Sequence, residues 1–222
     1  EGSYEFCYCT KCCHFSHVVK TALKEDVSLE TSSSFDIDLI LKLYEQGALT
    51  KETTIVHNGI KTEEYIEKIR FLQKQGFKHT ITILDSVQEL DRITMHKLDR
   101  PIKIGLRITI DEEPQAAYYT SRLGINKREL LELVKEKIQP NPLLELHMIH
   151  FFVDSGINDN LYYWGEFKKA LQLYTQIKQL APSLQALNIG GGFPIRNSLG
   201  FEYDYEYIVD EIVRNIKITC VE

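Results

Sequence analysis

Short apolar segments alternate with longer amphipathic ones along the whole 222-residue chain, and this alternation is the feature that most restricts the fold. The short segments are rich in β-branched residues and often apolar without interruption, as expected of strands buried on both faces. Eight segments have this character: 5–10, 27–31, 53–57, 79–84, 102–110, 144–152, 185–190 and 216–221. Seven helices are expected between them, at 15–24, 35–47, 62–76, 86–97, 126–138, 161–180 and 204–214.

Capping residues support these helices. Ser34, Thr62 and Ser86 stand where helices should begin, and Gly47 and Gly76 stand where helices should end. Eight strands separated by seven helices fit a (β/α)8 barrel that lacks its last helix. A doubly wound sheet is the competing arrangement, because alternation alone does not decide whether the sheet closes. No linker or internal repeat divides the sequence, so we expect one α/β domain over 1–222, with functional residues at the carboxyl ends of its strands.

Composition excludes several classes of protein. Hydrophobic residues make up 43% of the chain, enough for a substantial core. A net charge of −6 does not favour nucleic acid or an anionic membrane. No apolar run approaches the ~20 residues of a membrane span, and no secretory signal is visible. Five cysteines, an odd number with four of them in residues 7–13, indicate free thiols and a cytoplasmic protein.

The first strand carries the first candidate for chemistry. If the strand continues to Lys11, then Cys7, Cys9 and Lys11 share one face, and in a barrel that face could point inward. An interior lysine needs a partner or a Schiff base, whereas a lysine at a strand end is commonly a surface residue. Metal binding by the cysteines and the adjacent histidine of residues 7–14 is the rival hypothesis. It is the weaker one, because these residues cannot all converge without breaking the strand.

Charged residues within apolar strands are further candidates. Glu30 and Arg107 each fall at or within an expected strand, and a buried charge needs a partner or a function. His147 and His150 are three apart on one strand, so they lie on opposite faces and do not form a shared metal site.

Three consecutive glycines, Gly190, Gly191 and Gly192, follow the seventh strand and precede Phe193 and Pro194. Successive unhindered N–H groups at the carboxyl end of a strand suit a phosphate. A tight glycine turn explains the same residues equally well. The segment matches neither the dinucleotide-binding fingerprint nor a P-loop.

Several segments taken together resemble one family, the pyridoxal-phosphate-dependent decarboxylases of basic amino acids with an alanine-racemase-like barrel. In the first half of the chain, Tyr8-Cys9-Thr10-Lys11 resembles the family motif Y-A-x-K, and Glu30 with Ser32-Ser33-Ser34 resembles its acidic residue and small-residue turn. Val56-His57-Asn58-Gly59-Ile60-Lys61 resembles the next turn in its arginine decarboxylase version, and Leu106-Arg107-Ile108 matches the motif L-R-[IV]. Further along, Ser121-Arg122-Leu123-Gly124 resembles the motif S-K-F-G, and Asn188 to Pro194 matches the glycine-rich phosphate loop. The resemblance covers nearly the whole chain.

The resemblance implies a role for each matching residue. Lys11 would be the catalytic lysine that holds the cofactor as a Schiff base, with Glu30 close beside it. Arg107, Ser155 and the three glycines would bind the cofactor, the glycines through its phosphate. The strand expected at 216–221 would lead to the family's E-P-G-R, and Glu222 would then pair with the pyridine nitrogen.

Three departures from the family pattern stand out. Phe152 occupies the place of a histidine that stacks on the cofactor ring, and it is expected to stack without hydrogen bonding. Asp154 replaces a glycine next to Ser155 and brings negative charge near a phosphate. The family's closing helix and carboxyl-terminal β domain have no counterpart in these 222 residues, so we expect the chain alone to decarboxylate poorly.

The leading hypothesis is therefore decarboxylation of a basic amino acid, arginine first and ornithine second, in polyamine biosynthesis. We expect a homodimer, or a partner chain that supplies the missing domain, because a barrel that ends on its eighth strand exposes an apolar flank. The alternative is an impaired or regulatory relative that binds pyridoxal phosphate or a partner decarboxylase without turnover, and Phe152 and Asp154 favour it. A metal site at residues 7–14 is the third hypothesis.

Overall fold

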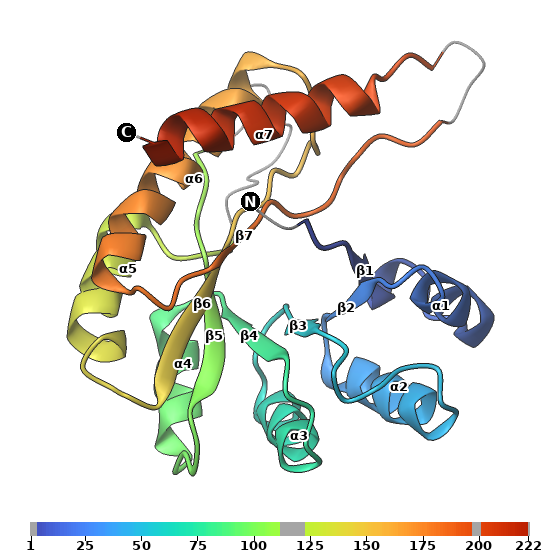
Figure 1. Ribbon diagram of the computed structural model, residues 1–222. Coiled ribbons are helices and arrows are strands. Elements are labelled where there is room, and N and C mark those ends of the chain that lie inside the picture. The colour runs from blue at the N-terminus through green and yellow to red at the C-terminus, as the bar shows by residue number, and fades with distance from the viewer. Residues whose placement is uncertain (1–3, 112–122, 197–200, 222) are drawn as a thin grey trace. The chain divides into compact units, whose positions relative to one another are not determined.

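The computed structural model describes residues 4–111, 123–196 and 201–221, in which strands and helices alternate (Figure 1). The chain forms two compact units. The first consists of Glu1–Gly105 with Leu143–Glu145, and the second of Leu106–Pro142 with Leu146–Glu222.

The elements of the first unit are β1 (Cys7–Cys9), the 3-10 turn η1 (Thr10–Cys12), α1 (Ser16–Leu23), β2 (Ser28–Thr31), α2 (Ser34–Glu45), β3 (Ile55–His57), α3 (Glu63–Lys74), β4 (Thr80–Leu84), α4 (Val87–Met95) and the start of β5 (Ile102–Arg107). The second unit contains the end of β5, α5 (Lys127–Leu133), the π-helical turn η2 (Val134–Ile138), most of β6 (Leu144–His150), α6 (Leu161–Leu180), β7 (Ala186–Asn188) and α7 (Tyr205–Val221).

The strands hydrogen-bond in chain order. In the first unit, β1 pairs in parallel with β2, β2 with β3 and β3 with β4, with Cys9 opposite Glu30 and Thr31 opposite His57. In the second unit, β6 pairs in parallel with β7, with His150 opposite Asn188. Because the strands are parallel, the carboxyl ends of neighbouring strands meet at one edge in each unit, where ligands of open and closed α/β sheets bind.

Side-chain caps fix the starts of several helices. The hydroxyl oxygens of Thr62 and Ser86 accept hydrogen bonds from the N–H groups three residues on, as expected from the sequence. The cap of α2 is Ser33 rather than Ser34, because the Asp36 carboxylate accepts from the Ser33 N–H at 2.9 Å and completes a capping box. Gly47 and Gly76, just beyond α2 and α3, have φ of 69° and 94°, which confirms both as helix stops.

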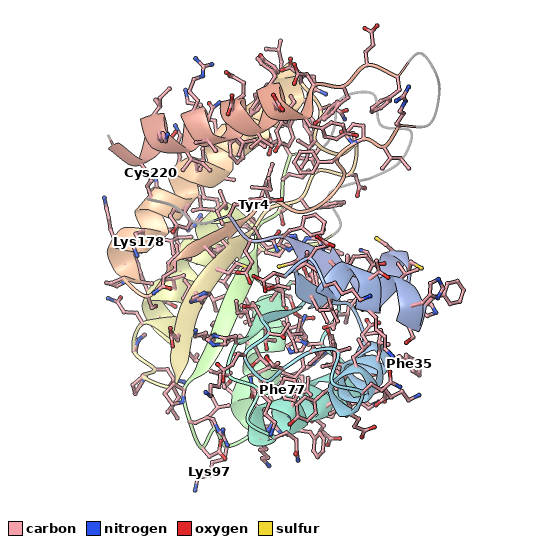
Figure 2. The ribbon with its side chains drawn as sticks, turned by 45° about the vertical axis from the view of Figure 1, so that its right-hand side comes forward. Tyr4, Phe35, Phe77, Lys97, Lys178 and Cys220 are labelled. Atoms are coloured by element: carbon pink, nitrogen blue, oxygen red, sulfur yellow. The ribbon has the colours of Figure 1, made fainter. Side chains whose placement is uncertain are left out.

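A hydrophobic core fills the first unit between strands and helices. Its buried members are Val19, Leu29, Ile37, Ile40, Leu43, Leu49, Ile55, Tyr65, Ile69, Leu72 and Phe77. Phe77 is 3% exposed and closes this core after α3, whereas Phe35 at the start of α2 is 76% exposed; Figure 2 labels both.

In the second unit, three buried aromatic rings join β6 to α6. The ring centroids of Phe151 and Tyr163 are 6.2 Å apart, and those of Tyr163 and Phe167 are 6.0 Å apart with nearly parallel planes. α7 packs along α6 (Figure 1), with Ile208 and Ile212 buried. Because such rings bury large apolar areas, they stabilise the packing of α6 against the residue that follows β6.

The eighth strand expected at 216–221 is wrong. These residues continue α7, and the described part of the chain contains seven strands. Ile208, Ile212 and the half-buried Ile216 recur every fourth residue, so the helical period of the preceding residues extends through the β-branched run. The expected strand leading to Glu222 is therefore absent.

The first strand is shorter than the expected 5–10, and it does not continue to Lys11. β1 ends at Cys9, and Lys11 lies in η1 with an exposed side chain. Alternation along a strand therefore does not place Lys11 on the face of Cys7 and Cys9.

Across the described residues, no helix is both long enough and apolar enough to cross a membrane.

Candidate functional site

The sequence-predicted residues of the first unit lie at the carboxyl ends of β1 and β2. Lys11 lies in η1, which follows β1 directly, and the buried Thr10 beside it donates its hydroxyl hydrogen to the main-chain oxygen of Glu30 at 3.0 Å. This bond fixes the turn that carries Lys11 against β2. The structure therefore brings the turn of Lys11 next to Glu30 and leaves the Lys11 side chain accessible.

Glu30 is the centre of a small polar cluster. Its Oε1 atom accepts a hydrogen bond from Asn58 Nδ2 at 3.2 Å and a weaker one from Cys9 Sγ at 3.7 Å. The pKa of the Cys9 thiol is raised to about 11, chiefly by burial and also by the Glu30 carboxylate, whereas Lys11 opposes the shift. Lys11 and Glu30, the two charged residues predicted to flank a cofactor, thus both act on one half-buried thiol.

Beneath this cluster, a buried polar network joins β2, β3 and α3. The hydroxyl of Thr31 lies 2.8 Å from His57 Nδ1 and 2.7 Å from the Tyr65 hydroxyl, and all three residues are buried. Burial, together with the nearby Lys61 cation, lowers the pKa of His57 to about 3. The network is therefore neutral and rigid, and it supports the two strand ends that carry Glu30 and Asn58.

The cysteines do not form a metal site in the part of the chain that is described. No group of three or more His, Cys, Asp or Glu side chains there is arranged to hold a metal ion, and all five cysteines are free thiols. Cys7 is half-buried, and desolvation raises the pKa of its thiol to about 12.

In the second unit, Arg107 ends β5 and faces Phe152, which follows β6. The guanidinium carbon of Arg107 lies 5.5 Å from the centroid of the Phe152 ring, within the range of a cation–π contact. The role of this ring as a stacking surface for a cofactor stays a prediction. Arg107 and Phe152 therefore form one group within their unit.

The glycine triplet follows β7 and packs closely against the segment after β6. A Cβ atom on Gly190 would lie 2.8 Å from Phe152 Cδ2, and one on Gly192 would lie 2.6 Å from Gly156 Cα. These two glycines also have φ of 73° and 102°, a region that favours glycine. Gly191 has open space around the position of a Cβ, so the middle of the loop faces outward.

Not all three glycine N–H groups are available to a ligand. The N–H of Gly190 donates to Asn188 Oδ1 at 2.8 Å, an Asx turn that orders the loop. Among the described residues, the N–H groups of Gly191 and Gly192 have no protein acceptor. Two adjacent free donors at a strand's carboxyl end make an anion-binding concavity, so the residues present fit a phosphate.

The remaining predicted residues fall into two groups. Ser155 and Asp154 are both exposed just after β6, so the Asp154 charge is solvated. Glu222 lies outside the described residues. Sequence analysis missed the side chains of Asn58 and Asn188, which orient Glu30 and the glycine loop. An asparagine two residues before a glycine was the available signal for the second.

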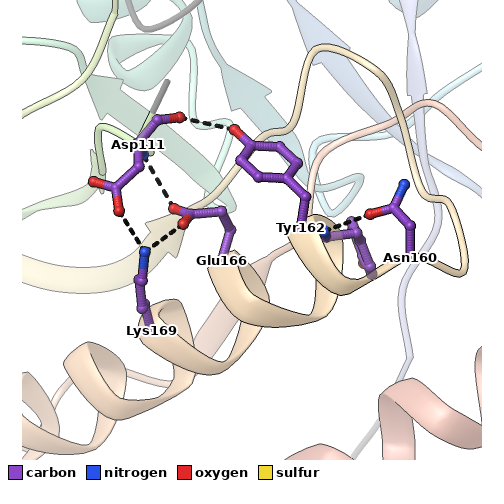
Figure 3. A network of polar contacts seen from close by, with 6 residues as sticks. Asp111, Asn160, Tyr162, Glu166 and Lys169 are labelled. Atoms are coloured by element: carbon purple, nitrogen blue, oxygen red, sulfur yellow. Dashed lines mark hydrogen bonds and ion pairs between the residues drawn. The ribbon is translucent and has the colours of Figure 1, made fainter. Parts of the chain in front are cut away.

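A separate polar network holds the start of the segment after β5. The buried carboxylate of Glu166 on α6 accepts from the Asp111 N–H at 3.1 Å and from Lys169 Nζ at 2.6 Å (Figure 3). The Tyr162 hydroxyl donates to the Asp111 main-chain oxygen at 2.8 Å, and Lys169 also pairs with the Asp111 carboxylate. Three residues of α6 therefore fix Asp111, four residues beyond Arg107.

Comparison with known proteins gives a consistent result. A family model described as "Pyridoxal-dependent decarboxylase, pyridoxal binding domain" matches residues 2–221. A biosynthetic arginine decarboxylase of Prochlorococcus marinus is 27% identical over 238 aligned residues, which cover 99% of this chain and 36% of that protein. The chain spans about a third of the length of the curated relatives it matches.

Two solved structures have a similar fold. The biosynthetic arginine decarboxylase of Campylobacter jejuni superposes with a TM-score of 0.79 at 23% identity, covering 100% of this chain and 37% of that one. Diaminopimelate decarboxylase of Helicobacter pylori, in a complex with L-lysine, gives a TM-score of 0.78 at 18% identity, covering 97% of this chain and 54% of that one. These likenesses show that the chain has the fold of this part of these decarboxylases.

Proposed function

Because the chain belongs to the pyridoxal-dependent decarboxylases, through their pyridoxal binding domain, we propose that it binds pyridoxal phosphate for the decarboxylation of a basic amino acid. Members of the family are pyridoxal-phosphate-dependent amino acid decarboxylases, which are lyases. The observation that carries the proposal is the loop after β7. There the N–H groups of Gly191 and Gly192, at the carboxyl end of a strand, have no acceptor in the part of the protein that the structure describes.

The phosphate end of the cofactor is assigned to the second unit. The N–H groups of Gly191 and Gly192 and the exposed hydroxyl of Ser155 are donors for its oxygens. Two backbone dipoles held in place by the contacts of Gly190 and Gly192 need no rearrangement to receive an anion. Phe152 offers an apolar face, and the Arg107 cation on this ring adds positive charge beside it.

Lys11 is assigned the covalent attachment of the cofactor. Its amine is exposed on η1, whose position Thr10 fixes by its bond to Glu30. The chemistry that pyridoxal phosphate supplies when bound is an electron sink for the pair released as CO2 leaves the substrate. The Glu30 carboxylate, held by Asn58, stabilises positive charge in this region.

Glu222 is proposed to pair with the pyridine nitrogen. This role rests on the sequence resemblance and stays a prediction, since the residue lies outside the described part of the chain. The residues before Glu222 belong to a helix and not to a strand, because α7 extends to Val221.

We further propose that residues 1–222 belong to one (β/α)8 barrel domain and that arginine is the substrate, with ornithine second. Curated relatives named biosynthetic arginine decarboxylase support the choice of arginine, and solved relatives named for lysine and diaminopimelate support the broader class. Such a decarboxylase would serve polyamine biosynthesis. A homodimer is the proposed assembly.

Cofactor binding tests the proposal directly. Purified chain mixed with pyridoxal phosphate is expected to develop the visible absorbance of lysine-bound cofactor, and borohydride reduction should attach the cofactor to the peptide that contains Lys11. Lys11→Ala should remove both signals. Lys11→Arg serves as the matched control, because it retains the charge but cannot form the bond. Undiminished absorbance in either variant, or labelling of another lysine, would contradict the assignment.

A further inference from the structure

The carboxylate of Glu30 is held on one oxygen by two donors from two neighbouring strand ends. Asn58 Nδ2 and Cys9 Sγ both approach Oε1, at 3.2 and 3.7 Å. The thiol is a weak donor, so the amide of Asn58 is the stronger of the two restraints. Glu30 itself is half-buried at the end of β2, where a carboxylate benefits from a neutral donor.

The orientation of the Asn58 amide follows from its other contact. Its Oδ1 atom accepts from the Gly59 N–H at 2.9 Å, which leaves Nδ2 to face Glu30. The main-chain N–H of Asn58 donates to the Thr31 oxygen at 2.8 Å, so the residue is tied to β2 by its backbone as well. Asn58 is 8% exposed, and few alternative rotamers remain open to it.

The backbone on either side is equally restricted. A Cβ atom on Gly59 would lie 2.3 Å from the Ser32 oxygen, and Gly59 has a φ of 73°. Thr31, between Glu30 and Ser32, is fixed by His57 and Tyr65. Asn58 therefore approaches Glu30 from a turn whose path is set by close packing against β2.

We infer that Asn58 is a positioning residue, whose amide holds the Glu30 carboxylate beside the turn of Lys11 and thereby sets the affinity for the cofactor. The inference rests on the proposed function, since it requires a cofactor attached at Lys11. A purely structural role for Asn58, as a residue that only stabilises its turn, is the alternative to exclude. A positioning role requires the negative charge to reside at position 30 for the cofactor to bind tightly. A purely structural role requires only that positions 30 and 58 form a hydrogen bond.

An exchange of partners separates these roles. Asn58→Asp brings two carboxylates to hydrogen-bond distance, which both destabilises the turn and displaces Glu30. The double variant Asn58→Asp with Glu30→Gln restores one amide and one carboxylate in exchanged places. We expect it to recover the Tm of the chain but not its affinity for pyridoxal phosphate.

A matched control is available on the surface. Asn126 Nδ2 donates to Glu129 Oε2 at 3.0 Å, and its Oδ1 accepts from the Glu129 N–H, but both residues are exposed. Asn126→Asp therefore creates a similar pair of carboxylates away from Glu30. It is expected to leave the affinity for pyridoxal phosphate unchanged.

The measurements are a titration with pyridoxal phosphate, followed by visible absorbance, and the Tm of each cofactor-free variant at neutral pH. Asn58→Asp should raise the Kd roughly tenfold or more and lower the Tm; the exchanged pair should regain the Tm with the Kd still raised. Recovery of both quantities in the exchanged pair, or a wild-type Kd in Asn58→Asp, would refute the inference. Failure of the proposed function has a different signature, because the wild-type chain itself would then bind no pyridoxal phosphate.

Discussion

Gly156 and Gly192 lie in direct backbone contact. A Cβ atom on Gly156 would stand 2.4 Å from the Gly192 oxygen, and one on Gly192 would stand 2.6 Å from Gly156 Cα. The Gly192 oxygen also accepts from the Ile157 N–H at 3.0 Å. The loops that follow β6 and β7 are therefore joined through their main chains.

This contact predicts a strong effect of alanine. Gly192→Ala or Gly156→Ala should lower the free energy of unfolding by about 2 kcal/mol or more, because backbone must move and φ is 102° and 84° at the two positions. Gly191→Ala is the control, since a Cβ atom at this position would have no other atom within 4 Å. In this control variant the free energy of unfolding, measured in urea, should fall by less than about 1 kcal/mol. Equal losses at positions 191 and 192 would rule out the close approach.

His57 predicts a dependence of stability on pH. Its pKa falls to about 3 in the folded chain, from about 6.5 when unfolded. Between these values the unfolded chain binds more protons, so stability rises with pH. The contribution of His57 is therefore complete above about pH 6.5, and it is lost as pH falls toward 3, by up to about 1.4 kcal/mol per pH unit.

His57→Gln should remove this slope from urea unfolding measured between pH 8 and pH 4.5. The matched control is His79→Gln, which changes an exposed histidine paired with Glu52 at 3.4 Å and should retain the slope. An unchanged slope in His57→Gln would mean that the buried histidine does not titrate on unfolding as described.

The network of Figure 3 predicts a cost for removing one cation. Lys169→Met leaves the Glu166 carboxylate, 6% exposed, with the Asp111 N–H as its remaining donor within this network. We expect a loss of about 1–3 kcal/mol, the range for a buried polar group deprived of a partner. Arg128→Met, which breaks an exposed pair with Glu132, should cost less than about 0.5 kcal/mol. Similar Tm values for both variants would argue against a special role of Lys169.

The thiols predict an order of alkylation. The raised pKa values of Cys7 and Cys9, about 12 and 11, keep both protonated at pH 8, and both are half-buried, whereas Cys12 is exposed. Iodoacetamide should modify Cys9 at least about tenfold more slowly than Cys12, as measured by mass spectrometry of peptides. In urea the five cysteines should react alike. Rapid labelling of Cys9 in the folded chain would contradict its packing against Glu30.

Much of the fold was predictable because strand and helix periods are local. The helix at 161–180 was confirmed at both ends, and Thr62 and Ser86 cap as expected. The pattern of residues 216–221 predicted a strand wrongly, because Ile216, Ile218 and their neighbours are compatible with both a strand and the continuing helix α7. Only packing against α6 distinguishes the two.

The sequence predicted which strands carry the candidate residues, but it did not predict the hydrogen bonds between them. Glu30 and Arg107 do lie in β2 and β5, as their apolar surroundings indicated. The bond from Asn58 to Glu30 joins residues 28 positions apart, and it follows only from the register of β2 and β3. Lys11 lies outside the strand, in the 3-10 turn that begins at Thr10, and the hydroxyl of Thr10 bonds to the main-chain oxygen of Glu30. A strand period does not predict such a turn.

The hydrogen bond from Gly190 to Asn188 has a kinetic consequence. A loop already shaped by its own side chain, and by contact with Phe152, loses little conformational entropy when an anion arrives. Association with a phosphate group should therefore be a single bimolecular step, without a slow isomerisation before or after it. Asn188→Ala would introduce that extra phase, although the side chain itself is not assigned to the ligand.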